Sequence, residues 1–339
     1  MSTITKMLML FFVIIIFLIC LAVFGYFFIG KAPEQKNILW GVNFSQMQAE
    51  ALKLDWRKTY LATLEDLGSK NIKLMTQWDF VEGKRGEYFF NDIDWQIQQA
   101  ELHNAKLTYV VGLKTGRWPE CHAPKWVSGI PETQQQEVLL KYVEKVVLRY
   151  KDSKAIVAWQ VENEPLFIFG ECPSWYYDNR DLLKKEVALV KSLDPERPII
   201  VSDSGEQSLW FGVAKIGDIV GNTMYRRLWF HIIDGVGFYG NFPIPPVFYY
   251  RRAQLIKYLF NKDVICVELQ AEPWANKLFY DVSLWEQEKT MNLRQFKKNV
   301  SYARQTGLGE FYFWGTEWWY WLKTTQNKPE IWEEAKKLF

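Results

Sequence analysis

The chain has 339 residues and a formal charge of +2, from 41 Lys and Arg against 39 Asp and Glu. This near-balance gives no basic surface for a nucleic acid, and a hydrophobic fraction of 49% excludes a disordered chain. Aromatic residues make up 17% of the chain and include 17 Trp. So many Trp residues suggest a role beyond core packing, because aromatic faces are seldom left exposed without a ligand.

An uncharged apolar segment occupies residues 7–30, between Lys6 and Lys31. At about 1.5 Å per residue it can cross a hydrocarbon core of about 30 Å with some tilt. A cleaved signal peptide is the alternative, but its apolar region is shorter and ends in small residues, whereas this run continues as Tyr-Phe-Phe-Ile. We therefore predict a transmembrane anchor at residues 1–30, in the lipid bilayer through residues 7–30, and one further domain at residues 31–339.

Eight short β-rich apolar runs follow, and stretches with helical spacing lie between and after them. The alternation predicts an α/β protein with a closed (β/α)₈ barrel, preceded by the single transmembrane helix. A doubly wound open sheet is the alternative, but neither glycine-rich nucleotide-binding pattern is found. The fifth unit is the weakest, because its helix is short. The runs begin near Leu39, Ile72, Leu107, Ile156, Pro198, Asp218, Val264 and Glu310.

The four cysteines fall in different settings. Cys20 lies in the predicted span and Cys266 in an apolar run, whereas Cys121 and Cys172 lie in polar loop sequences. The last two could pair if the domain lies outside the cytoplasm, and the sequence leaves this open. The three histidines are scattered and no C-x-x-C pattern occurs, so we expect neither a metal site nor a cofactor.

Functional groups in such a barrel come from the carboxyl ends of the strands and from the loops that follow them. Glu164 follows the fourth apolar run and Glu268 lies near the end of the seventh. An ionised carboxylate at the end of a buried strand carries a desolvation cost, so two of them favour chemistry over structural ion pairs.

The segment WQVENEP at residues 159–165 resembles the Asn-Glu-Pro signature of clan A glycoside hydrolases. ICVELQAEPW and the second-strand segment IKLMTQWDFVEGKRGEYFFNDIDWQI are similar to other parts of the clan's pattern, and the cellulase-like family 5 and β-galactosidase families 35 and 42 are the nearest in resemblance. The resemblance implies a retaining β-glycosidase with Glu164 as acid/base and Glu268 as nucleophile. We therefore expect a membrane-anchored enzyme, its barrel outside the cytoplasm, that cleaves a β-linked oligo- or polysaccharide by double displacement.

The resemblance also implies substrate-binding residues. Asn163 is similar to the clan's Asn that bonds the sugar 2-hydroxyl, Tyr225 to the Tyr that contacts the nucleophile, and Trp314 to the Trp that stacks on the sugar. Glu272, four residues after Glu268, competes with it as nucleophile or else binds substrate. The further substrate-binding candidates lie at a strand end or in a later loop: Trp78, Glu272 and Trp274.

Several alternatives stay open at this point. Glu162 stands two residues before Glu164, so both point the same way if the strand stays extended. Lys73 occupies the position where clan members commonly carry an Arg, and Lys gives charge without a bidentate fork. The main rival function is a catalytically silent glycan-binding barrel protein at the cell surface. A Schiff-base enzyme using Lys114 and a membrane scaffold without chemistry are further alternatives.

Overall fold

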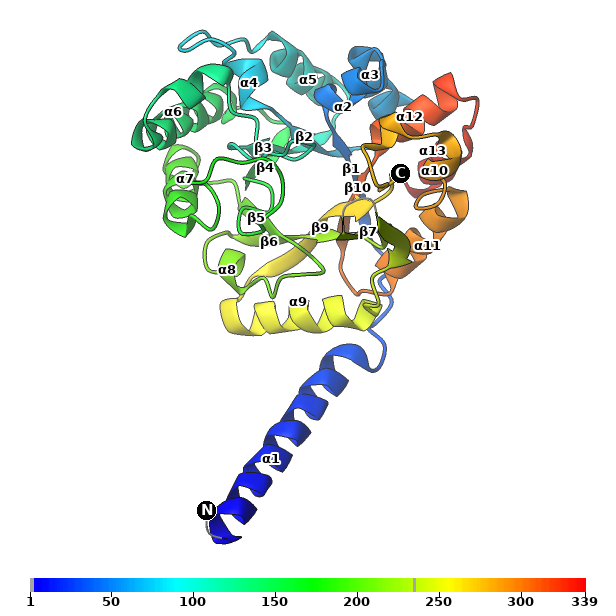
Figure 1. Cartoon of the computed structure of the whole chain (residues 1–339). Coiled ribbons are helices and arrows are strands. Elements are labelled where there is room, and N and C mark those ends of the chain that lie inside the picture. Colours follow the sequence, from blue (N-terminus) through cyan, green and yellow to red (C-terminus); the bar gives the residue numbers. More distant parts are fainter. Residues whose placement is uncertain (1–2, 234–235) are drawn as a thin grey trace.

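The computed structural model describes residues 3–233 and 236–339. Eight parallel strands close into a barrel in the order β1-β10-β9-β6-β5-β4-β3-β2, with helices around it (Figure 1). All eight predicted strands are present, so the expected (β/α)₈ fold is confirmed. The strands are β1 (Leu39–Phe44), β2 (Asn71–Met75), β3 (Lys106–Val111), β4 (Ile156–Val161), β5 (Ile199–Asp203), β6 (Ile219–Met224), β9 (Asp263–Gln270) and β10 (Glu310–Trp314).

Helices cover the outside of the barrel, and several begin at a side-chain cap. The Asp55 side chain accepts hydrogen bonds from two backbone N–H groups at the start of α3. The Asn292 side chain accepts one such bond at the start of α11. The fifth unit has only the single turn α8, as its sequence predicts. The helices are α2 (Gln46–Ala51), α3 (Trp56–Glu65), α4 (Trp78–Val81), α5 (Asn91–Leu102), α6 (Glu132–Tyr150), α7 (Arg180–Leu193), α8 (Phe211–Ala214), α9 (Pro246–Phe260), α10 (Leu284–Gln287), α11 (Leu293–Arg304), α12 (Thr316–Thr325) and α13 (Glu330–Ala335), with 3₁₀ turns η1 (Lys125–Gly129), η2 (Phe279–Asp281) and η3 (Lys336–Leu338).

A small apolar cluster fills the inside of the barrel and forms a floor beneath the strand ends. Its members are Ala158, Ile200, Ile265, Val267 and Tyr312, and their neighbours along each strand belong to the larger core outside the barrel. This alternation follows from the two-residue period of a strand. Gly41 on β1 leaves room for the Tyr312 ring, because an added Cβ would lie 2.7 Å from it.

A two-stranded antiparallel hairpin, β7 (Arg227–Ile233) and β8 (Val236–Asn241), is inserted between β6 and α9. It is an addition that the sequence analysis did not predict. The Gln270 side chain at the end of β9 accepts hydrogen bonds from the backbone N–H groups of Arg226 and Arg227, at 2.8 and 2.9 Å. These bonds fix the base of the hairpin over the carboxyl ends of the barrel strands.

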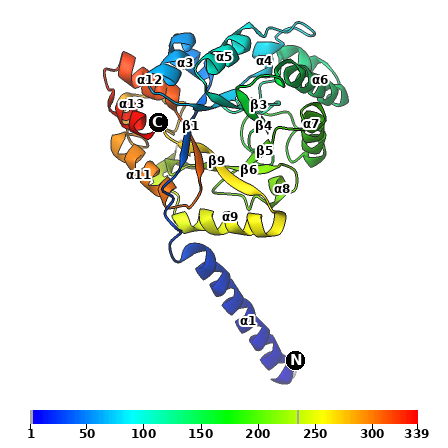
Figure 2. The same ribbon diagram turned by 180° about the vertical axis from the view of Figure 1, so that it is seen from behind.

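The predicted N-terminal helix is present as α1 (Thr3–Phe28). It leaves the ring of helices on the side of α9 (Figures 1 and 2). Its segment Ile4–Phe28 is long and apolar enough to cross a membrane by length and composition, and its side chains are mostly exposed.

Candidate active site

Two hollows open at the carboxyl ends of the strands and share one wall. The smaller has a volume of about 240 Å³ and is lined by both Glu164 and Glu268. The larger, of about 590 Å³, lies between the loops that follow β3 and β9. The two hollows adjoin, since four side chains line both of them: Glu120, Phe169, Trp274 and Trp314. Together we call them the cleft.

Glu268 lies near the end of β9 and is held by two donors. The Lys73 ammonium on β2 donates to Oε1 at 3.0 Å, and the Tyr225 hydroxyl just after β6 donates to Oε2 at 2.8 Å. Lys73 is fully buried, so little solvent weakens its attraction for the carboxylate. Lys73 therefore does reach the site, where it forms a buried ion pair with Glu268.

Glu164 lies just beyond β4 in the opposite electrostatic setting. Its Oε1 accepts one hydrogen bond, from the Thr223 hydroxyl at 2.8 Å, and no cation lies within ion-pair distance of it among the described residues. Burial, together with the negative charge of Glu268, raises the pKa of Glu164 to about 8. At neutral pH the group is protonated, which is the state that a general acid requires.

Asn163 lines the smaller hollow together with these two carboxyls. Its Oδ1 accepts from Lys73 Nζ at 3.3 Å and from Gln160 Nε2 at 3.2 Å. Its side chain also hydrogen-bonds Glu120, a third carboxyl in the cleft. Burial raises the pKa of Glu120 to about 7, and the positive charge of Lys114 opposes this rise. Sequence reasoning missed Glu120, which lies in the polar loop after β3 and carries no motif.

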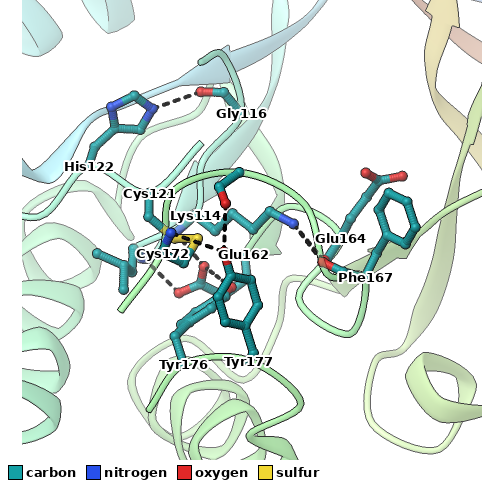
Figure 3. The surroundings of a disulfide bond; sticks show 12 residues. Lys114, Gly116, Cys121, His122, Glu162, Glu164, Phe167, Cys172, Tyr176 and Tyr177 are labelled. Carbon is teal, nitrogen blue, oxygen red and sulfur yellow. Dashed lines mark hydrogen bonds between the residues drawn. A yellow bond between two sulfur atoms is a disulfide. The ribbon is translucent and has the colours of Figure 1, made fainter. Parts of the chain in front are cut away.

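Glu162 and Lys114 line neither hollow, and other groups bind their side chains (Figure 3). The Glu162 carboxylate accepts from the backbone N–H groups of Leu113 and Lys114, at 2.7 and 2.6 Å, and from the Tyr176 hydroxyl at 2.8 Å. Lys114 Nζ donates to the carbonyls of Glu164 and Phe167, both at 3.0 Å. The side chains of Glu162 and Glu164 point apart, contrary to the extended-strand expectation, because both residues have a positive φ, 62° and 46°.

Glu272 lies in the larger hollow and is bound by Arg117. The other guanidinium nitrogen of Arg117 donates to Glu317 at 2.8 Å, and the guanidinium lies 4.1 Å from the centre of the Trp314 ring. Burial raises the pKa of Glu272 to about 7, opposed by the charge of Arg117. Arg117 links the loop after β3 to those after β9 and β10, a connection that sequence reasoning did not find.

The predicted aromatic residues divide between the cleft and the core. Trp314 and Trp274 line both hollows, and Trp274 packs edge-on against Tyr225 at 4.9 Å between ring centroids. Trp78 does not line the cleft: it is fully buried, donates to Glu82 at 2.8 Å and stacks on Tyr142. Trp78 is therefore a core residue, because α4 turns its side chain away from the strand ends.

Comparisons with known proteins agree with the barrel fold. The family model described as Glycosyl hydrolase family 10 matches residues 34–335. Native xylanase 10B from Thermotoga maritima superimposes with a TM-score of 0.58 at 14% identity, covering 89% of this chain and 95% of that one. A GH10 endoxylanase from a sugarcane soil metagenome gives 0.59 at 14% identity, with 89% and 98% covered. The β-galactosidase of Halorubrum lacusprofundi gives 0.57 at 14% identity, with 81% and 52% covered.

The fold and the match define the chain as a clan A glycoside hydrolase with a retaining β-glycosidase architecture. Within that clan it belongs to glycosyl hydrolase family 10. The clan predicted from WQVENEP is confirmed. The family is 10, whereas the motifs had indicated families 5, 35 and 42 as the nearest in resemblance.

Proposed function

We propose that the protein is a membrane-anchored glycosidase whose nucleophile is Glu268 and whose acid/base is Glu164. Residues 1–30 form the anchor and residues 31–339 the catalytic domain, which faces away from the cytoplasm. The observation that carries the proposal is the contrast between two carboxyls in one cavity. Glu268 is held by an ammonium and a hydroxyl, whereas the pKa of Glu164 is raised to about 8.

The contrast assigns each step of a double displacement. Glu164 gives its proton to the leaving oxygen while a Glu268 oxygen attacks the anomeric carbon, so the glycosidic bond breaks and a glycosyl ester forms. Glu164, now a carboxylate, then takes a proton from water, whose oxygen attacks the same carbon and releases Glu268. Lys73 and Tyr225 hold the nucleophile in place and receive it back as an anion.

A β-linked oligo- or polysaccharide fits the cleft. Trp314 and Trp274 offer flat apolar faces for sugar rings, and Asn163 offers an amide for a ring hydroxyl. Trp118, 44% exposed, extends the aromatic lining into the larger hollow, which has room for further units of a chain. Xylanase 10B from Thermotoga petrophila RKU-1 was solved with xylobiose, so β-xylosides are the first substrates to try, with β-galactosides next.

Two features support a location outside the cytoplasm. Cys121 and Cys172 form a disulfide across the loops that follow β3 and β4, and such bonds persist in oxidising compartments (Figure 3). The helix α1 suits a single membrane crossing by length and composition. Protease added to intact cells should digest the barrel domain, and full protection of the domain would reverse this orientation.

The decisive experiment traps the intermediate. The full chain in detergent is incubated with 2-deoxy-2-fluoro β-glycosides that carry activated leaving groups, and the labelled peptide is found by mass spectrometry. We expect the adduct on Glu268 and none in the Glu268→Gln variant. An adduct on Glu272 would keep the double displacement and move the nucleophile. A folded sample that yields no adduct and cleaves no β-linked oligosaccharide would support the silent glycan-binding alternative.

A further inference from the structure

Helix α9 lies crosswise at the end of α1 (Figures 1 and 2). Phe248 of α9 packs against Phe28 and Phe27, with ring centroids 4.8 and 6.0 Å apart. The Arg251 guanidinium lies 4.6 Å from the centre of the Tyr26 ring. Aromatic and cation–π contacts therefore join the last turn of α1 to the first half of α9.

The length of α1 sets the depth of this junction. The apolar segment Ile4–Phe28 has 25 residues, or about 38 Å at 1.5 Å per residue, against a hydrocarbon core of about 30 Å. When Lys6 stays in the headgroup layer on one side, residues 26–28 reach the headgroup layer on the other. Tyr and Arg side chains favour that layer, because each has an apolar body and a polar end.

The outer face of α9 is apolar and cationic. Tyr258 is 85% exposed and Leu259 51%, and the helix contains no Asp or Glu. Arg251 is partly exposed. It forms no ion pair within residues 3–233 and 236–339, and its buried Nε has no hydrogen-bond partner there. Lys257 is paired with Asp263 at 2.9 Å, so the face carries little net charge beyond Arg251.

We propose that α9 lies in the headgroup layer of the bilayer that α1 spans, with Tyr258 and Leu259 at the apolar boundary and Arg251 on a lipid phosphate. The inference rests on the membrane anchoring in the proposed function. The contact is continuous with the α1–α9 junction and needs no movement of the fold.

This contact has a consequence for the cleft. In both views α1 leaves the ring of helices beside α9, at the rim of the ring (Figures 1 and 2). With α1 and α9 both attached to the membrane, this rim lies against the membrane surface and the cleft opens to the side. Glycans that lie along the membrane would then enter the cleft more readily than those that approach from above.

Spin labelling of the full chain in phosphatidylcholine vesicles tests the contact. A nitroxide is placed at Gln254→Cys, on the outer face of α9, in a Cys20→Ser background that leaves Tyr258 and Leu259 in place. The matched control is Leu102→Cys on α5, which is exposed on the opposite side of the ring (Figure 1). Access of dissolved oxygen and of a water-soluble nickel chelate is measured on vesicles recovered by flotation.

We expect the label on α9 to be several-fold less accessible to the nickel chelate than the label on α5. Adding Tyr258→Ser and Leu259→Ser should return much of that access. Equal access at the two labels in floated protein would overturn the α9 contact and leave the anchor intact. Failure of the uncleaved chain to float would overturn both the α9 contact and the membrane anchor. Hydrolysis of β-glycosides by the same samples is measured separately and tests only the enzymatic part of the proposed function.

Discussion

Replacing Lys73 by Met should lower kcat/KM by about two orders of magnitude, because the nucleophile candidate Glu268 loses one of its two donors. Lys73 is fully buried and lies 3.0 Å from Glu268 Oε1. At an effective dielectric constant of about 20, a pair at that distance attracts by about 5.5 kcal/mol. Met has a similar length and no charge, so the substitution leaves Glu268 in the cleft with Tyr225 as its remaining donor.

The net effect is smaller than the Coulomb attraction, because the two groups also lose hydration when they are buried together. Removing one partner of a buried pair costs about 3 kcal/mol or more. A loss of that size in the transition state lowers kcat/KM about 100-fold. The alkaline limb of the pH profile, which we attribute to Glu164, should stay near pH 8.

The assay is the hydrolysis of an activated aryl β-glycoside between pH 4 and 9, with circular dichroism to confirm folding. Lys73→Arg is the matched control: it keeps the charge and should keep most of kcat/KM. A Lys73→Met enzyme that is folded and has an unchanged kcat/KM would refute the reasoning, since the ammonium would then make no contribution to the reaction at Glu268.

Three other changes test separate parts of the site. Glu164→Ala should lower hydrolysis of substrates with poor leaving groups by about 10²–10⁴-fold and remove the alkaline limb near pH 8, and azide should restore turnover of an activated substrate as a β-glycosyl azide. Glu120→Gln should raise KM about tenfold with a smaller change in kcat, if Glu120 and Asn163 hold the substrate through charged hydrogen bonds; an unchanged kcat/KM would show that the carboxylate does not contact it. Replacing Cys121 and Cys172 by Ser opens a loop with a sequence separation of 51, so denaturant unfolding should show a loss of up to about 4 kcal/mol, and an unchanged midpoint would contradict a stabilising disulfide.

The barrel could be predicted because its strands are buried on both faces. Such strands form short, nearly continuous apolar runs, and runs of this kind begin at or near all eight observed strands. The hairpin β7–β8 was missed because it packs over the strand ends instead of joining the barrel. The Asp-Gly pair at residues 234–235, flanked by apolar residues, is the sequence signal that could have predicted it.

The candidate site was only partly predictable, since its remaining contacts join residues far apart in the chain. Arg117 binds Glu272 and Glu317, 155 and 200 residues away, and no local pattern encodes those distances. The same limit applies to Trp78. Its position after an apolar run indicated a strand end, but β2 ends at Met75 and the side chain turns into the core beside Tyr142.

Two residues whose roles stayed open in the sequence, Glu162 and Lys114, help to hold Glu164 in place. A positive φ on a residue with a side chain costs about 1–3 kcal/mol, so the backbone at Glu164 needs support from its surroundings. Glu162 supplies it by binding the loop after β3, and Lys114 by donating to the carbonyl of Glu164. The Ser202 hydroxyl accepts a hydrogen bond from the backbone N–H of Glu164 at 2.9 Å. Glu162 and Lys114 therefore keep the acid/base candidate aimed into the cleft, and they do so from positions that line neither hollow.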